Sequence, residues 1–298
     1  IRGVLAKLHK AGYPVAGFDM YVTSTVLPGS GLSSSAACEV LIGTTGNHLF
    51  CQDRFDAVEI AKIGQAAENE YFGKPCGLMD QTASSVGDAV AIDFKDPANP
   101  IVRSINADLT GLGLALCIID CGADHAALTN EYASIPEEMC KVAAHFGKKV
   151  LREVKEEDLL ADLAQVRKEA GDRAVLRALH FYADDRRAAE EADALERKDK
   201  EAFLNLVKES GRSSWELLQN ITPAAAITHQ DMAVALAVAE KALNGKGACR
   251  VHGGGFAGTI QAFVPVEDVC EFKKTMETML SEGCCHVLSI RPAGGLIL

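Results

Sequence analysis

Apolar side chains recur along the chain at two spacings, and each spacing predicts one kind of element. Residues 1–12 carry apolar positions at helical spacing and end in a glycine, so they predict a helix. Residues 18–27 alternate apolar and polar side chains with a period of two, which predicts a strand with one buried face. Further helices are expected from about Ser34 and over residues 53–72, the latter opened by Asp53 and closed by a glycine.

The second part of the chain predicts strands that flank a long helical region. Its expected elements are, in order, a strand at 89–94, a turn at 96–100, a strongly apolar strand at 112–122, mostly helix over 126–219, a strand region at 249–265, a helix near 266–281 and a strand at 285–292. The turn reads DPANP and marks the expected boundary between two halves. The predicted class is therefore α+β in two lobes, 1–100 and 101–298, whose sheets are covered on one side by helices.

The composition narrows the class of partner. The 298 residues are 48% hydrophobic and 24% charged, which is ordinary for a soluble globular enzyme. A formal net charge of −11 argues against nucleic acid or an anionic membrane as the main partner. No apolar run is long enough to span a bilayer. An anionic small molecule remains compatible with this charge where the site supplies its own positive potential.

The cysteines indicate a reducing compartment. Ten cysteines are scattered along the chain, none of them in a CxxC pair, and Cys284 and Cys285 are adjacent. A chain of this size builds a full core without disulfides, so we expect reduced thiols and a cytoplasmic location.

The stretch LPGSGLSSSAACEVL at 27–41 places glycines and serines at the start of a predicted helix. The first N–H groups of a helix lack internal partners and attract anions, glycines permit close approach of a phosphate, and serine hydroxyls add donors or ligands for a hard cation. Two familiar phosphate loops are excluded. The Walker loop is excluded because its lysine is absent here and Ser35 is followed by alanine. The dinucleotide-binding fingerprint is excluded because Ser34 replaces its third glycine. The alternative is that Ser33 or Ser34 only caps the helix.

Two carboxylates follow the serine-rich loop at a suggestive spacing. Glu68 lies late on the predicted second helix, and Asp80 follows twelve residues later, at the start of another short helix. Near an anion site, one carboxylate suits Mg²⁺ and the other suits a proton. The alternatives are that Asp80 is an N-cap and that Glu68 is an exposed helix acid.

A glycine cluster precedes one of the last predicted strands. Residues 252–258 read HGGGFAG, and three successive glycines allow backbone conformations that other residues avoid, as well as close contact with a ligand. The alternative is a tight turn without a ligand.

Taken in order, PxGxGLSSSA, a Glu-x11-Asp pair around PCGLMDQ, and GGGFAG resemble the motif set of the GHMP small-molecule kinases, and their wording most closely resembles the galactokinases. The resemblance runs from about residue 2 to the end and includes 173–195, which looks like the family's helix after the sugar-contact region. It implies the two-lobed GHMP kinase fold, with an N-lobe like domain 2 of ribosomal protein S5, a ferredoxin-like α/β C-lobe, and ATP and sugar in the cleft between lobes.

The resemblance also implies roles for individual residues. In that family the serine loop wraps the nucleotide phosphates, a serine and a glutamate hold Mg²⁺, an aspartate is the catalytic base, a tyrosine touches the sugar, and the last glycines close over the phosphate side. These roles map, in that order, onto Gly29, Ser30, Gly31, Leu32, Ser33, Ser34 and Ser35 for the loop, Ser35 and Glu68 for the metal, Asp80 for the base, Tyr132 for the sugar, and Gly253, Gly254 and Gly255 for the glycines.

The function implied is an ATP- and Mg²⁺-dependent transfer of the γ-phosphoryl group to the anomeric C1 hydroxyl of galactose. The alternatives are a related kinase for galacturonate, N-acetylgalactosamine or arabinose, and a non-catalytic galactose sensor on the same scaffold. In the sensor class the serine loop carries lesions, whereas here the loop and both carboxylates are intact.

Three departures from the family pattern accompany the resemblance. The family's N-terminal signature, an Arg followed by a Gly-Glu-His-x-Asp cluster, is not found in residues 1–298, and the sequence opens at Ile1 inside a helical pattern. We therefore expect that signature to lie upstream, and a chain without it to have little activity by itself. The sequence 218–220 reads LQN where the family usually has a Tyr-x-x-Ser segment, and His252 replaces a threonine, either as a polar contact at the site or as a structural hydrogen bond.

Overall fold

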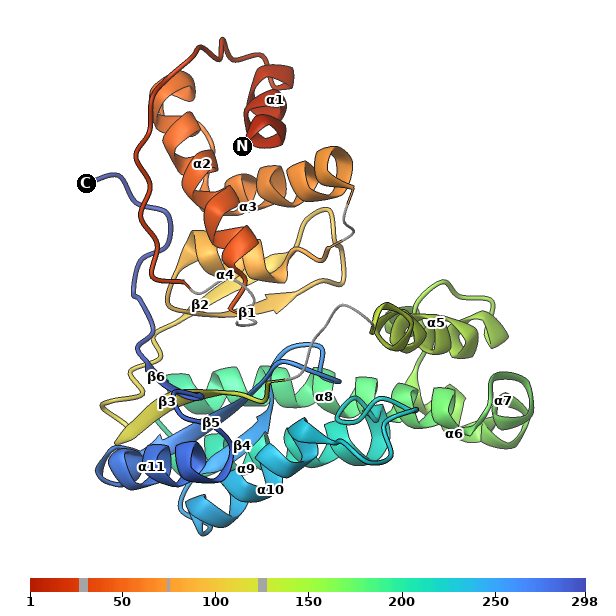
Figure 1. The fold of residues 1–298 in the computed structure, drawn as a ribbon. Coiled ribbons are helices and arrows are strands. Elements are labelled where there is room, and N and C mark those ends of the chain that lie inside the picture. The colour runs from red at the N-terminus through yellow and green to blue at the C-terminus, as the bar shows by residue number, and fades with distance from the viewer. Residues whose placement is uncertain (27–31, 74–75, 123–127) are drawn as a thin grey trace. The chain divides into compact units, whose positions relative to one another are not determined.

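The structure is a computed structural model that describes residues 1–26, 32–73, 76–122 and 128–298 (Figure 1). The chain forms two compact units. Unit 1 contains residues 1–107 and 290–298, and unit 2 contains residues 108–289. The chain end returns to unit 1, where the backbone N–H of Asp88 donates to the carbonyl of Arg291 at 2.8 Å.

Unit 1 is built mainly from helices around a small sheet. Its elements are α1 (Arg2–Lys10), α2 (Ser34–Cys51), α3 (Ala57–Ala66), the π-helical turn η1 (Ala67–Phe72), α4 (Met79–Val86), β1 (Ala89–Asp93) and β2 (Ile101–Ile105). The two strands pair antiparallel, with Ala91 opposite Arg103. Val4, Ile42 and Ala67 form a buried cluster that joins α1, α2 and η1. This packing fixes α2 relative to the turn that carries Glu68.

The strand predicted at 18–27 is wrong over the part that the structure describes. Residues 13–25 form neither helix nor strand, and Tyr21 and Val22 are 93% and 48% exposed. A strand needs a hydrogen-bonded neighbour for its N–H and C=O groups. Among the described strands of unit 1, only β1 and β2 pair with each other. The segment therefore has the alternating pattern of a strand but no neighbouring strand to pair with.

The second predicted helix exists but begins later than expected. Asp53 has a left-handed backbone with φ of 55°, whereas Asp56 caps the helix that starts at Ala57. The Glu59 N–H donates to the Asp56 carboxylate at 2.8 Å, and the Asp56 N–H donates to the Glu59 carboxylate at 2.8 Å, which is a complete capping box. The predicted end is confirmed, because Gly73 closes the turn with φ of 77°.

Unit 2 contains a four-stranded sheet covered by helices. Strands β3 (Leu114–Asp120), β4 (Ala248–Val251), β5 (Thr259–Pro265) and β6 (Cys285–Leu288) lie in the order β4-β5-β3-β6, and every neighbouring pair is antiparallel. Helices α10 (Asp231–Leu243) and α11 (Val269–Met279) pack on the sheet through a shared apolar core. The chain order β-α-β-β-α-β with this strand order is the ferredoxin-like arrangement predicted for the second lobe. The mixed α+β prediction is confirmed.

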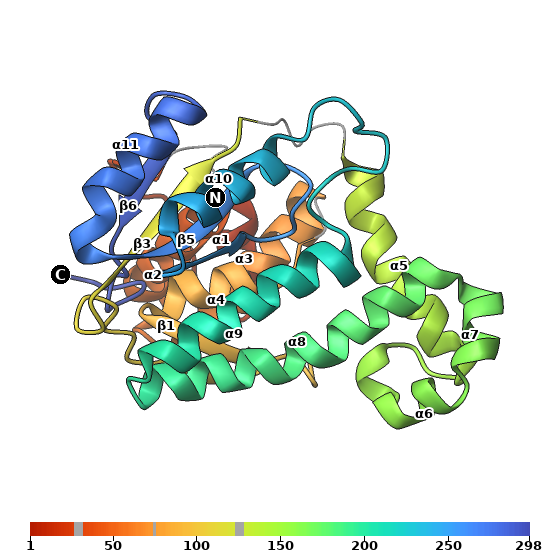
Figure 2. The same cartoon turned by 90° about the horizontal axis from the view of Figure 1, so that it is seen from below.

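The long helical region of unit 2 is also confirmed. It comprises α5 (Thr129–His145), η2 (Leu151–Glu153), α6 (Glu156–Ala161), α7 (Leu163–Ala170), α8 (Asp172–Glu196), α9 (Lys200–Ser213) and the π-helical turn η3 (Ser214–Leu218). Helices α8 and α9 run side by side, and α5, α6 and α7 gather at one end of α8 (Figures 1 and 2). In the described parts of the chain, no helix has both the length and the apolar character that crossing a bilayer requires.

His145 ties the end of α5 to the neighbouring short helices. Its Nδ1 lies 2.7 Å from the Glu169 carboxylate and its Nε2 lies 2.8 Å from the Asp162 carboxylate. Both contacts favour the protonated ring, and they raise the pKa of His145 above its ordinary value. Glu169 responds in the opposite direction, since the ring lowers its pKa.

This arrangement predicts a stability difference that depends on pH. Because the pKa of His145 is raised in the folded state, its contribution is fully present below the unfolded pKa of about 6.5 and is lost as the pH rises through the folded value. His145→Gln should therefore lower the melting temperature clearly at pH 5.5 and little at pH 9. Exposed His229→Gln is the control, and an equal loss from His145→Gln at both pH values would contradict the account.

Candidate active site

The serine-rich loop leads directly into α2. Gly29, Ser30 and Gly31 lie outside the described residues, so the structure bears only on Leu32 to Ser35 of this loop. Ser33 precedes the helix in a left-handed conformation with φ of 54°, and its side chain makes no capping hydrogen bond. Ser34 is the first residue of the helix. The interpretation of these hydroxyls as a simple side-chain cap is therefore wrong.

The first turn of α2 retains the properties of an anion site. It carries no acidic side chain and receives no side-chain cap, so its N–H groups keep their partial positive charge. Ser35 is exposed in this turn. Glu39 follows Ser35 by four residues and therefore lies on the same face of the helix, one turn further along.

A buried amide joins Glu39 to Glu68. The Gln81 side chain is 2% exposed, and its Nε2 donates to the Glu39 carboxylate at 3.0 Å and to the Glu68 carboxylate at 3.3 Å. Glu68 is 5% exposed, so its interpretation as an exposed helix acid is wrong. Together these contacts bring Glu68 close to Glu39 on α2.

The burial and the neighbouring charge in this cluster change the pKa of Glu39. Burial raises the pKa of Glu39 to about 7, the amide of Gln81 opposes this shift, and the nearby carboxylate of Glu68 adds to it. Gly64 of α3 makes room for the cluster, because a β-carbon there would lie 3.1 Å from Cβ of Glu39 and 3.5 Å from Cγ of Gln81.

Asp80 lies in the first turn of α4, immediately before Gln81. The N-cap position of α4 is Leu78, so the interpretation of Asp80 as the cap is wrong. Its side chain is exposed.

The approach to α4 is tied to the turn that carries Glu68. Asn69 accepts a hydrogen bond from the backbone N–H of Cys76 at 2.7 Å and donates to the carbonyl of the same residue at 3.4 Å. Gln65 donates to that carbonyl at 3.2 Å. Since Asn69 follows Glu68 directly in η1, these bonds fix the start of the segment leading to Asp80 against the base of the carboxylate cluster.

Sequence reasoning missed three residues of this cluster, namely Glu39, Gln81 and Asn69. Glu39 was detectable through its position four residues after Ser35, and Gln81 and Asn69 through their places next to the predicted carboxylates. The π-helical turn η1 gave no such signal. It matters because an inserted residue in a helix redirects the following side chains, a feature that is frequent at functional sites.

Unit 2 brings Tyr132 and the glycine cluster together. The Tyr132 hydroxyl donates to the carbonyl of Gly255 at 2.8 Å, and its ring meets Phe256 edge to face with centroids 5.6 Å apart. Gly253, Gly255 and Phe256 all have left-handed backbones, with φ of 66°, 81° and 60°. The glycines therefore provide a conformation that most residues avoid.

Asn220 supports the same loop from the other side. Its Nδ2 donates to the Gly254 carbonyl at 3.1 Å, and its own carbonyl accepts from the Phe256 N–H at 2.5 Å. His252 bonds to Thr259 both through its Nδ1, at 3.0 Å from the threonine hydroxyl, and through its backbone N–H at 3.1 Å. The structural interpretation of His252 is thus supported by contacts across the base of the loop.

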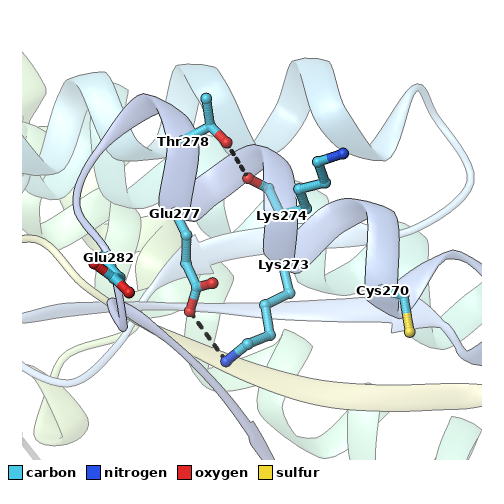
Figure 3. Close-up of a pocket in the computed structure, with 6 residues that line it drawn as sticks. All are labelled: Cys270, Lys273, Lys274, Glu277, Thr278 and Glu282. Carbon is cyan, nitrogen blue, oxygen red and sulfur yellow. Dashed lines mark hydrogen bonds and ion pairs between the residues drawn. The ribbon is translucent and has the colours of Figure 1, made fainter.

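One surface hollow lies apart from these residues. It has a volume of about 420 Å³ and is lined by Cys270, Lys273, Lys274, Glu277, Thr278 and Glu282 on and after α11 (Figure 3). Lys273 pairs with Glu277 at 3.1 Å, so opposite charges compensate each other there. None of the predicted site residues lines this hollow.

Comparison with known proteins places these features in a family. The family model for the N-terminal domain of GHMP kinases matches residues 1–88. A galactokinase of Streptomyces coelicolor is 33% identical over 275 residues, which is 92% of this chain and 68% of the relative. A galactokinase of Actinobacillus pleuropneumoniae serotype 3 is 34% identical and covers 90% of this chain and 67% of the relative. The chain belongs to the galactokinase family of GHMP kinases.

Solved structures agree with this family in their fold. Lactococcus lactis galactokinase, solved as a complex with galactose, matches with a TM-score of 0.78 at 23% identity and covers 100% of this chain and 75% of that one. Leishmania major mevalonate kinase, solved with R-mevalonate, matches with a TM-score of 0.53 at 12% identity over 87% of this chain and 66% of that one. The predicted resemblance and fold are confirmed. This galactokinase-family chain spans about two thirds of the length of the curated relatives.

The glycine loop of this family member yields a matched pair of variants. Alanine at Gly253 or Gly255 must adopt a positive φ, at a cost of about 1–2 kcal/mol. At Gly253 the new β-carbon meets nothing within 4 Å, whereas at Gly255 it clashes with the carbonyl oxygen and side chain of Asn220. Urea unfolding should therefore show Gly255→Ala to be less stable than Gly253→Ala by about 1–3 kcal/mol. Equal stabilities would contradict the described loop geometry.

Proposed function

We propose that this protein transfers the γ-phosphoryl group of ATP to the anomeric C1 hydroxyl of galactose. The observation that carries the proposal is the Glu39–Gln81–Glu68 cluster. It sets the buried carboxylate of Glu68 close to Glu39, which lies one turn after Ser35 on α2, and its Gln81 directly follows the exposed Asp80. Membership of the galactokinase family supports the choice of reaction, and galactose is the sugar in the Lactococcus lactis complex.

In this proposal the nucleotide phosphates bind at the start of α2. The loop 29–35 supplies backbone N–H groups, serine hydroxyls and the positive end of the helix dipole. The motif contains no Walker lysine, so peptide dipoles take over the role of that side chain. Phosphoryl transfer through a loose transition state asks a protein mainly for positioning and neutralisation of charge, which this arrangement provides.

Ser35 and Glu68 are proposed to hold Mg²⁺. Their hydroxyl and carboxylate oxygens are the donors that this hard cation prefers. Two carboxylates converge on one amide, and their proximity helps to raise the pKa of Glu39, which is the electrostatic situation that a bound cation relieves. When bound, the ion neutralises charge on the β- and γ-phosphates.

Asp80 is proposed to accept the proton of the attacking sugar hydroxyl. Its carboxylate is exposed and not committed to a cap, so it is available to a substrate. A carboxylate is a weak base, and it suffices where the proton moves late, as the hydroxyl oxygen bonds to phosphorus. Tyr132 is proposed to contact the sugar, and Gly253, Gly254 and Gly255 to approach the phosphates.

Related substrates and a sensor function are the other candidates. Galacturonate, N-acetylgalactosamine or arabinose would change the sugar contacts and leave the chemistry as described. A non-catalytic sensor is disfavoured because Ser33, Ser34, Ser35, Glu68 and Asp80 are all present. All ten cysteines are free thiols, which supports the proposal that the enzyme acts in the cytoplasm.

The substrate assignment is tested by coupled ADP release with a panel of these four sugars. The measurement uses the complete gene product, since the chain spans 68% of its Streptomyces coelicolor relative. Galactose should give the highest kcat/KM. Turnover with another sugar of the panel but not with galactose would overturn the substrate, and binding of ATP and galactose without turnover would establish the sensor.

Asp80→Asn tests the proposed base. The variant should lower kcat by about 10²–10⁴-fold, the usual contribution of a general base, while the affinity for ATP stays within about twofold. Asp158→Asn is the control, because Asp158 is also an exposed acid in the first turn of a helix, α6. Rapid-quench kinetics and nucleotide titration separate the two effects, and an unchanged kcat would remove Asp80 from the mechanism.

Glu68→Gln tests the proposed metal ligand. Loss of one carboxylate ligand should raise the Mg²⁺ concentration for half-maximal rate by about 10-fold or more, and should weaken Mn²⁺ binding to the enzyme–ATP complex in electron paramagnetic resonance titrations. Glu70→Gln is the matched control, because Glu70 lies on the same turn η1 but is exposed and pairs with Lys7 at 2.9 Å. Identical metal dependence in both variants would contradict the assignment.

A further inference from the structure

Arg177 on α8 is the largest side chain that is completely buried in the described structure, with 0% exposure. Burial of a guanidinium is costly unless its donors are bonded. Its Nε donates to the carbonyl of Leu218 at 3.1 Å, and its Nη1 donates to the Ser134 hydroxyl and the Glu138 carboxylate, both at 2.9 Å. Its Nη2 has no partner among the described residues.

The partners of Arg177 lie next to the two supports of the glycine loop. Ser134 follows Tyr132 by two residues on α5, and Leu218 precedes Asn220 by two residues at the end of η3. Tyr132 and Asn220 are the side chains that hold Gly254 and Gly255. One guanidinium therefore connects the backbone segments on both sides of the loop.

The local backbone explains why an arginine is suited to this place. The turn η3 is π-helical and ends where Gln219 turns left-handed with φ of 57°, which leaves the Leu218 carbonyl available to Arg177. A planar guanidinium can donate to two elements at once, whereas an ammonium group is a single point of charge. Arg173 orients Glu138 from the other side, with contacts of 2.6 and 3.1 Å.

We propose that Arg177 is a positioning residue, which fixes Tyr132 and Asn220 and through them the conformation in which unit 2 presents residues 253–256. The inference rests on the proposed function, because Tyr132 and the glycines are the proposed contacts to sugar and phosphates. The competing explanation is that Arg177 and Glu138 form an ion pair that only stabilises the fold. The two explanations differ in what happens when stability is restored without the guanidinium.

The test compares Arg177→Lys and Arg177→Met with the double variant Arg177→Met/Glu138→Leu. The double variant removes both charges of the pair, and such replacements commonly recover the stability that a single removal loses. Val166→Ala is the control for stability, since Val166 on α7 is buried in an apolar cluster that includes neither Tyr132 nor Asn220. The melting temperature of each variant is measured first, and the other readouts are compared between variants of similar melting temperature.

Two readouts report on position rather than on stability. The first is hydrogen exchange of the peptide containing Phe256, whose N–H is bonded to the Asn220 carbonyl. The second is the separation of KM for galactose from kcat in coupled assays. We expect exchange of this peptide to rise by about 10-fold and kcat/KM to fall by about 10–100-fold in both single variants, because a displacement of about 1 Å costs about this much in rate. The double variant should regain stability, but its hydrogen exchange should stay raised and its kcat/KM should stay lowered.

The single tryptophan, Trp215, lies within η3 and gives a further signal. Its emission should shift in the Arg177 variants and stay constant in Val166→Ala. Recovery of exchange, emission and kinetics together in the double variant, or the same changes in Val166→Ala, would overturn the positioning role. Absence of galactose turnover in the unmodified protein would instead defeat the proposed function, while the exchange and emission measurements would still decide the role of Arg177.

Discussion

The hydrogen bonds from the Gln81 amide to two carboxylates hold the proposed site of unit 1 together. Gln81 is buried between Glu39 on α2 and Glu68 on η1, and it donates to both. These bonds hold three elements of unit 1 together, and they place the buried carboxylate of Glu68, the proposed metal ligand, close to Glu39 in the second turn of α2. Without them, the serine loop, Glu68 and Asp80 would be separate features of the sequence with no reason to act together.

The two units support their functional residues by comparable means. In unit 1, side-chain amides bond to carboxylates and backbone groups, as Gln81 and Asn69 do. In unit 2, a buried guanidinium and an asparagine bond to backbone carbonyls around glycines that have little side chain of their own. In both cases a π-helical turn, η1 or η3, lies beside the site residues. Buried polar groups with defined partners specify a conformation more narrowly than apolar packing does.

The sequence predicted well what local signals determine. The order of helices and strands in unit 2 follows from periodicity, and the end of η1 follows from Gly73. The segment 18–27 was predicted wrongly, because alternation indicates a strand but does not supply a neighbour. The start of α3 was predicted too early. Asp53 and Asp56 are equally good caps by residue type, and only the reciprocal bonds between Asp56 and Glu59 select one of them. Glu39 escaped prediction because its role needs the contact with Gln81, 42 residues away.

We propose that a divalent ion held by Ser35 and Glu68, together with peptide dipoles at the start of α2, takes the place of a phosphate-binding lysine. A crystal structure of the complete gene product with Mg²⁺, a non-hydrolysable ATP analogue and galactose would decide whether this is so. We expect an ion bonded to the Ser35 hydroxyl and the Glu68 carboxylate, with Asp80 facing the C1 hydroxyl of the sugar. An ion bonded to other residues, or a lysine on the γ-phosphate in its place, would contradict it.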